Sequence, residues 1–135
     1  MIKKIENLMV RDALVYLFTE YQENVRNAVI TRIKHQSDNN RDIVSFVQSR
    51  IRKTRMMINE LQGLLGTFNP AYASKFAQQL TSEEEKYRYS SIILGRLNVA
   101  HDQGNNLKIE SLRELKVAHE HAQRLLLKFE GSLWT

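Results

Sequence analysis

Apolar residues recur at helical spacing along nearly the whole chain, and only one proline, Pro70, stands in a position to break a helix. The first segment follows the i, i+3, i+4, i+7 rule of a helix with one buried face, through Leu14, Leu17, Phe18, Tyr21, Val25, Ala28 and Val29. The strict alternation of apolar and polar residues that marks a half-buried strand does not occur. The pattern therefore predicts an all-α protein.

Polar and turn-forming residues divide this pattern into segments. The first helix is expected to end near residues 37–40, and further helices are expected over about 41–65, 70–80, 82–101 and 112–129. Two pairs match the capping box, in which a hydroxyl and a carboxylate satisfy free amides at a helix start: Thr81 with Glu84, and Ser111 with Glu114. Short connections favour an antiparallel up-and-down bundle of four main helices plus a short extra helix, forming a single domain over 1–135.

The composition limits the cellular compartment in which we expect the protein and the kinds of site that it can form. The 135 residues include no cysteine, which excludes disulfides and thiolate metal sites, so we expect a protein of the reducing cytoplasm. Glu6, Arg11 and Asp12 interrupt the apolar N-terminal run, which excludes a signal-peptide core there and predicts no membrane partner. The formal net charge of +5 suits a polyanion such as nucleic acid without requiring one.

An arginine interrupts the apolar face of the helix expected over 82–101. With about 100° per residue, Ile92 and Ile93 lie about 40° and 60° to the two sides of Arg96. A buried unpaired charge costs several kcal/mol, and no acidic residue stands three or four positions away to pair with this one. The guanidinium therefore needs water, a partner from another helix, or a function.

His101 follows Arg96 near the end of the same predicted helix. It lies about 140° around the axis and about 7.5 Å along it, so the two side chains can share a cleft. Asn98 and Asp102 flank the pair, and the Asn98 amide can help to hold the imidazole. Arginine stabilises developing negative charge and histidine moves protons near neutral pH, which suits phosphate chemistry. The structural alternative is an arginine that extends its head to solvent.

The run from Arg96 to His101 resembles the signature of the HEPN superfamily, which is an arginine, four to six intervening residues and a histidine near the end of a bundle helix. The resemblance extends to residue 127, through a glycine-containing turn and Ser111 at the start of a last amphipathic helix. The first half of the chain resembles the family only in its helical pattern. Two positions depart from it: Leu97 replaces a common polar residue, and Gln103 replaces a tyrosine of some related toxins.

The resemblance implies a metal-independent endoribonuclease that is a homodimer, with two arginine–histidine pairs meeting in one composite active site. The RNA 2′-hydroxyl attacks the adjacent phosphate and leaves a 2′,3′-cyclic phosphate and a 5′-hydroxyl. His101 would be the general base or acid, and Arg96 would stabilise the phosphoryl charge. Small stand-alone members act as toxins or antiviral defence effectors, so an antitoxin or other regulatory protein is an expected partner. No cofactor is implied.

Other residues are candidates for contact with RNA. Arg50 and Lys53 belong to the densest basic run, and Lys86 and Arg88 precede the motif on its own helix. Tyr89 lies about 20° around the helix from the motif arginine, where it can line the cleft or stack on a base. A solvated basic face and a core tyrosine are the structural alternatives.

Two clusters of titratable residues have structural interpretations. In His119-Glu120-His121 the histidines are two apart, and such residues point to different sides of a helix, so we predict a surface segment and no metal site. The acidic run 83–85 begins a predicted helix, where it favourably meets the positive end of the helix dipole.

Three function classes remain open. The first is the ribonuclease, which requires both Arg96 and His101. The second is a catalytically silent helical dimer that binds nucleotide, RNA or a protein partner through the same groove. The third is a bundle that serves only as an interaction or assembly domain, in which both residues can be changed freely.

Overall fold

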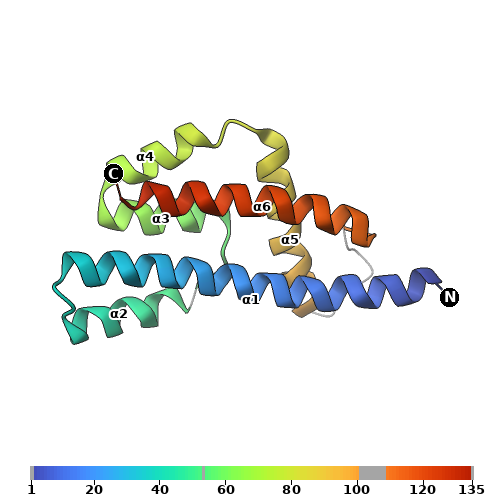
Figure 1. The fold of residues 1–135 in the computed structure, drawn as a ribbon, viewed down its shortest axis with the longest axis horizontal. Coiled ribbons are helices and arrows are strands. Elements are labelled where there is room, and N and C mark those ends of the chain that lie inside the picture. Colours follow the sequence, from blue (N-terminus) through green and yellow to red (C-terminus); the bar gives the residue numbers. More distant parts are fainter. Residues whose placement is uncertain (1, 53, 101–108, 135) are drawn as a thin grey trace. The chain divides into compact units, whose positions relative to one another are not determined.

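A computed structural model describes residues 2–52, 54–100 and 109–134 of the chain. Within these ranges the protein consists of helices and turns and contains no strand, which confirms the predicted all-α class. The helices are α1 (Ile2–Gln36), α2 (Arg41–Ile51), α3 (Ile58–Phe68), α4 (Pro70–Gln79), α5 (Glu83–Ala100) and α6 (Leu112–Ser132), labelled in Figure 1. Over the described ranges, none of these helices combines the length and the apolar character that crossing a membrane requires.

The helices group into two compact units. The first unit comprises Met1–Glu20 and Ser82–Leu125, and the second comprises Tyr21–Thr81 and Leu126–Thr135. α1 and α6 therefore each contribute their N-terminal part to the first unit and their remaining turns to the second.

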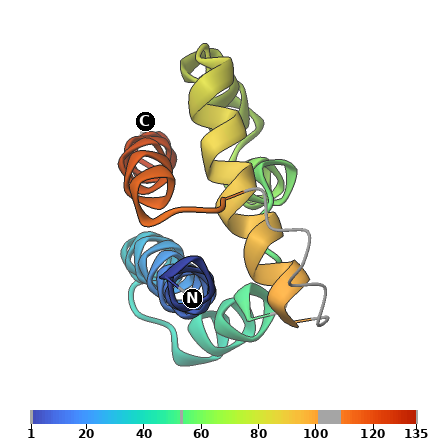
Figure 2. The same ribbon diagram turned by 90° about the vertical axis from the view of Figure 1, so that its right-hand side faces the viewer.

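In the first unit, α5 runs steeply across the beginnings of α1 and α6 (Figures 1 and 2). The core of this unit is built from the apolar faces of all three helices and includes Val10, Leu14, Tyr89, Ile92, Ile93, Leu115, Ala118, Ala122 and Leu125. These residues recur at helical spacing within each segment, so the periodicity of the sequence correctly marks the faces that become buried.

The second unit contains the remaining turns of α1 and α6 together with α2, α3 and α4. α2 folds back along α1, and α3 packs against α4 (Figure 1). Its core includes Tyr21, Val25, Val29, Ile51, Met56, Leu61, Leu65, Phe76, Phe129 and Leu133. The rings of Phe76 and Phe129 meet edge to face with 5.9 Å between their centres, a favourable arrangement for two aromatic side chains.

The single helix expected over about 41–65 is wrong, because α2 and α3 are separate helices. The chain leaves the helical conformation after Ile51, and Met56 takes a φ of 66°. That left-handed conformation costs an ordinary residue roughly 1–2 kcal/mol. The Met56 side chain is fully buried, so its burial offsets the cost of the backbone.

Side-chain hydrogen bonds hold the break between α2 and α3. The Thr54 hydroxyl accepts a hydrogen bond from the Met56 amide at 3.3 Å and donates one to the Glu60 carboxylate at 3.2 Å. The same carboxylate oxygen accepts from the Arg55 amide at 3.0 Å. These polar partners replace the backbone hydrogen bonds that a continuous helix would have made.

Serine hydroxyls begin both helices of the first unit for which a capping box was predicted. At α6, Ser111 Oγ accepts from the Glu114 amide at 3.0 Å, as the sequence predicts. At α5, the cap is displaced by one residue from the predicted Thr81, because Ser82 Oγ accepts from the Glu85 amide at 3.1 Å. The helix start is therefore fixed by Ser82.

Candidate functional site

A close approach of α5 to α1 positions the motif arginine in the first unit. Gly95 is buried against Leu14, and a Cβ atom built on it would lie 3.0 Å from Leu14 Cδ1. Phe18 lies one helical turn beyond Leu14 on the same face of α1. The absence of a side chain at 95 lets the Leu14 side chain lie against α5 at this point, and Arg96, the next residue of α5, reaches Phe18.

The Arg96 side chain is half-buried, and its charge is only partly compensated. The guanidinium carbon lies 5.5 Å from the centre of the Phe18 ring, within the range of a cation–π contact. Nε is buried and has no hydrogen-bond partner among the described residues. An unsatisfied donor of a charged group is costly, so the position of Arg96 destabilises the described part of the fold. The contact with Phe18 agrees with the position on an apolar helix face that the periodicity of the sequence predicts for Arg96.

The structure does not describe the side chains of the other predicted site residues around Arg96. His101 and Asp102 lie outside the described residues. Asn98 belongs to α5, but its side chain is also outside what the structure describes. The predicted pairing of the arginine with the histidine therefore stays a prediction.

The basic residues proposed for RNA contact have different surroundings. Lys86 forms an ion pair with Glu83 at 2.8 Å, and Arg88 lies 3.7 Å from a carboxylate oxygen of Glu84. Both cations of the first unit are thus partly neutralised by acids of their own helix. Arg50 is exposed on α2 in the second unit, and Lys53 lies outside the described residues.

Tyr89 occupies the core and does not line a cleft. Its side chain is fully buried in the first unit, among the residues that join α5 to its neighbours. A base can stack only on a ring with an exposed face, so the predicted stacking role of Tyr89 is wrong for this conformation of the chain. Tyr89 is a core tyrosine, which is the structural alternative stated for it above.

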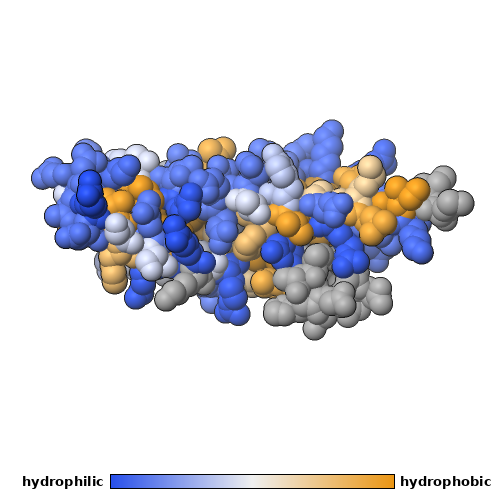
Figure 3. Space-filling model, turned by 90° about the horizontal axis from the view of Figure 1, so that it is seen from below, coloured by the Kyte–Doolittle hydropathy of each residue, from blue (hydrophilic) through white to orange (hydrophobic). Residues whose placement is uncertain are grey.

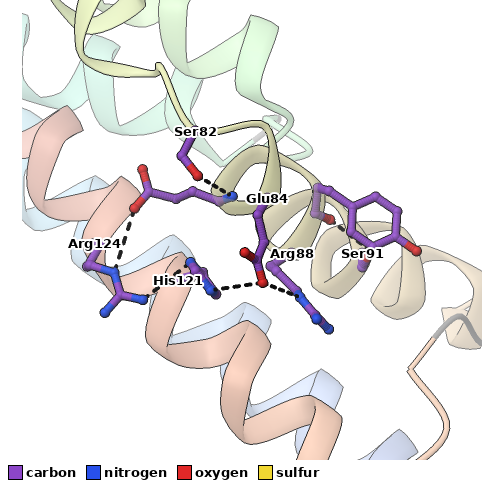
Figure 4. Close-up of polar contacts among 8 residues, drawn as sticks. Ser82, Glu84, Arg88, Ser91, His121 and Arg124 are labelled. Carbon is purple, nitrogen blue, oxygen red and sulfur yellow. Dashed lines mark hydrogen bonds and ion pairs between the residues drawn. The ribbon is translucent and has the colours of Figure 1, made fainter.

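A polar cluster that sequence reasoning missed joins α5 to α6 in the first unit (Figure 4). Glu84 Oε1 lies 3.6 Å from His121 Nε2 and 3.7 Å from Arg88 Nε. The buried Glu85 carboxylate lies 3.8 Å from Arg124 Nε. We refer to Glu84, Glu85, Arg88, His121 and Arg124 as the α5–α6 cluster.

The His121 ring lies between a cation and an anion of the cluster. Its Nδ1 is 3.3 Å from Arg124 Nη2, and its Nε2 faces Glu84. The His121 side chain is 18% exposed, so it is partly covered while it faces Glu84 of α5.

A signal for the cluster does exist in the sequence. Three acids begin α5, whereas the facing stretch of α6 carries His121 and Arg124 at a spacing of three, on one helical face. The favourable interaction of acids with the helix dipole already explains their position, so the sequence analysis did not predict that they pair with α6. Across the described ranges, no group of three or more His, Cys, Asp and Glu residues is placed to hold a metal ion.

Apolar side chains remain exposed on the first part of α1. Ile5, Leu8 and Met9 are each more than half exposed. Tyr16, about two helical turns after Met9, is exposed as well. Figure 3 shows apolar surface gathered near the N-terminal end of this helix. A contiguous apolar surface of this kind is typical of protein–protein contact.

Comparison with known proteins adds no family assignment, since no protein-family model, no curated protein and no solved structure matches this chain.

Proposed function

We propose that this protein is a metal-independent endoribonuclease of HEPN type, a toxin or defence effector acting on RNA in the cytoplasm. The observation that carries the proposal is the state of Arg96. Its guanidinium is half-buried near the end of α5, stacks on Phe18, and leaves Nε without a hydrogen bond among the described residues. Five residues later the sequence supplies His101.

The proposed reaction needs two roles that these residue types fill. His101 takes the proton from the RNA 2′-hydroxyl, or gives one to the leaving 5′-oxygen, near neutral pH. Arg96 stabilises the negative charge that develops on the phosphoryl oxygens. The bond from phosphorus to the 5′-oxygen breaks as the bond to the 2′-oxygen forms, which yields a 2′,3′-cyclic phosphate and a 5′-hydroxyl end.

A homodimer would place two such pairs in one composite site. The exposed apolar residues Ile5, Leu8 and Met9 support self-association, because a surface of this composition is more stable when covered. A regulatory protein, such as an antitoxin, would act by covering the same site or by preventing this association.

The first experiment incubates the purified protein with mixed RNA in EDTA and identifies the ends of any fragments. We expect cyclic phosphate ends from the natural protein and a loss of at least about 100-fold in rate for Arg96→Ala and His101→Ala. Arg113→Ala is the matched control, because this arginine is exposed on α6. Intact RNA from the folded natural protein, together with retained RNA binding, would favour the silent binding module.

The stability of an Arg96→Met variant separates a functional arginine from a structural one. If Arg96 is retained for catalysis at a cost to the fold, methionine should raise the free energy of unfolding by about 1 kcal/mol while abolishing cleavage. Urea titration measures this change. A clear loss of stability would instead assign Arg96 a structural role.

A further inference from the structure

The second unit contains a cavity of about 490 Å³ between the last turns of α1, α2 and the second half of α3. Its walls are largely aliphatic and aromatic, with Ile33, Val47 and Leu64 contributed by the three helices in turn. Its volume falls within the roughly 300–1,000 Å³ typical of small-molecule sites. The cavity is partly open to solvent, so a ligand could enter without unfolding the unit.

Arg50 is the one charged residue in the lining of this largely apolar cavity. Around the axis of α2, Arg50 lies about 40° from Phe46 and about 60° from Val47, and both of these also line the cavity. Arg52 is the C-cap residue that follows α2, and it does not line the cavity. Arg50 therefore belongs to the apolar, cavity-facing side of its helix.

The cation at the cavity has no acidic counterpart. The lining includes no aspartate or glutamate, and no carboxylate of the described residues forms an ion pair with Arg50. Its guanidinium carbon lies 6.0 Å from the centre of the Phe46 ring, which is itself 64% exposed at the cavity edge. A guanidinium held beside an apolar cavity matches a ligand with one planar anionic group.

We propose that this cavity binds a small amphiphile of the fatty-acid type, a single alkyl chain ending in a carboxylate. The chain occupies the apolar interior, and the carboxylate pairs with Arg50 at the rim. Gln36 and Thr67 also line the cavity and offer polar groups to the head. This site lies in the second unit, whereas Arg96 lies in the first, so the proposal is independent of ribonuclease activity.

Calorimetric titration of the full-length protein with octanoate and decanoate, below their micellar concentrations, tests the proposal. Each buried methylene strengthens binding about fourfold, so decanoate should bind about fifteenfold more tightly than octanoate. Nonyltrimethylammonium, which has the same alkyl chain and the opposite charge, should bind at least about tenfold more weakly than decanoate. Equal affinities for the two head groups, or no decanoate binding by the folded protein, would overturn the proposal.

Variants locate the ligand. Arg50→Ala should weaken decanoate binding about tenfold and leave decanol binding unchanged within about twofold. Arg52→Ala is the matched control, because this arginine follows α2 and does not line the cavity, and it should bind decanoate normally. Val47→Phe fills the cavity and should weaken both ligands, and circular dichroism verifies that each variant is folded. Decanoate binding that Arg50→Ala and Val47→Phe leave intact would place the ligand elsewhere and refute this site.

Discussion

The guanidinium carbon of Arg32 lies 5.3 Å from the centre of the Trp134 ring. Arg32 Nε also donates to the Leu133 carbonyl at 2.8 Å, and Nη2 donates to the Tyr72 hydroxyl at 3.2 Å. The His35 ring meets the Trp134 ring edge on, with 5.4 Å between the two ring centres. Within the second unit, Arg32 of α1 thus contacts both α4 and the residues that follow α6.

Trp134→Ala should lower the free energy of unfolding by about 1–2 kcal/mol, because it removes the ring that covers Arg32. A double-mutant cycle with Arg32→Ala, measured by urea denaturation, should give a coupling energy of about 0.5–1 kcal/mol. Tyr16→Ala is the control, since this ring is 64% exposed, and it should change stability by less than about 0.5 kcal/mol. Additive effects of the Arg32 and Trp134 changes would contradict the contact.

Ser82→Ala should lower the free energy of unfolding by about 1 kcal/mol, because the serine hydroxyl accepts from the Glu85 amide at the start of α5. Thr81→Ala should have an effect of less than about 0.5 kcal/mol, although the sequence alone favours Thr81 as the cap. Thermal denaturation of the two variants decides between the positions. A larger effect at Thr81 would restore the original capping box.

Gly63→Ala should raise the free energy of unfolding by roughly 0.8 kcal/mol, because this helical glycine has open space around it and alanine is the better helix former. Gly95→Val should lower it by about 1–3 kcal/mol, because the larger side chain must displace Leu14. Chemical denaturation measures both changes. If Gly95→Val were neutral, the close approach of α5 to α1 would not hold.

Alkaline pH should destabilise the protein through Tyr21. Burial raises the pKa of this phenol above its ordinary value of 10.0, so the folded state keeps the proton that the unfolded chain releases. The stability contributed by the neutral ring is complete below pH 10 and decreases above it, by up to about 1.4 kcal/mol per pH unit. Tyr21→Phe should flatten this decrease in urea titrations from pH 8 to 11. An unchanged slope would assign the alkaline effect to other groups.

The helical class, the buried faces and most helix ends follow from the sequence, because periodicity and caps are local signals. The break between α2 and α3 does not, since the apolar spacing continues through Met57 and Leu61 as if the helix were unbroken. The turn that follows α2 is held by the Glu60 carboxylate, which accepts hydrogen bonds from Thr54 and Arg55. A polar side chain can lie within a helix or hydrogen-bond to the backbone of a turn, and the local sequence does not determine which of the two occurs.

For the candidate site, too, the sequence predicts local features but does not predict contacts between helices. The position of Arg96 on an apolar face follows from helical geometry, and its contact with Phe18 agrees with that prediction. The partners of Glu84 come from another helix, and no local pattern specifies which helix faces it. Tyr89 shows the converse error, because helical proximity to the motif does not distinguish a core position from a cleft position.

The division of α1 and α6 between both units has a consequence for synthesis on the ribosome. Each unit combines an early part of the chain with a part of α6, which begins only at Leu112. Neither unit can therefore complete its core until α6 has left the exit tunnel. Contacts of such long sequence separation slow folding, and α1 of the nascent chain stays uncovered until α6 has been synthesised.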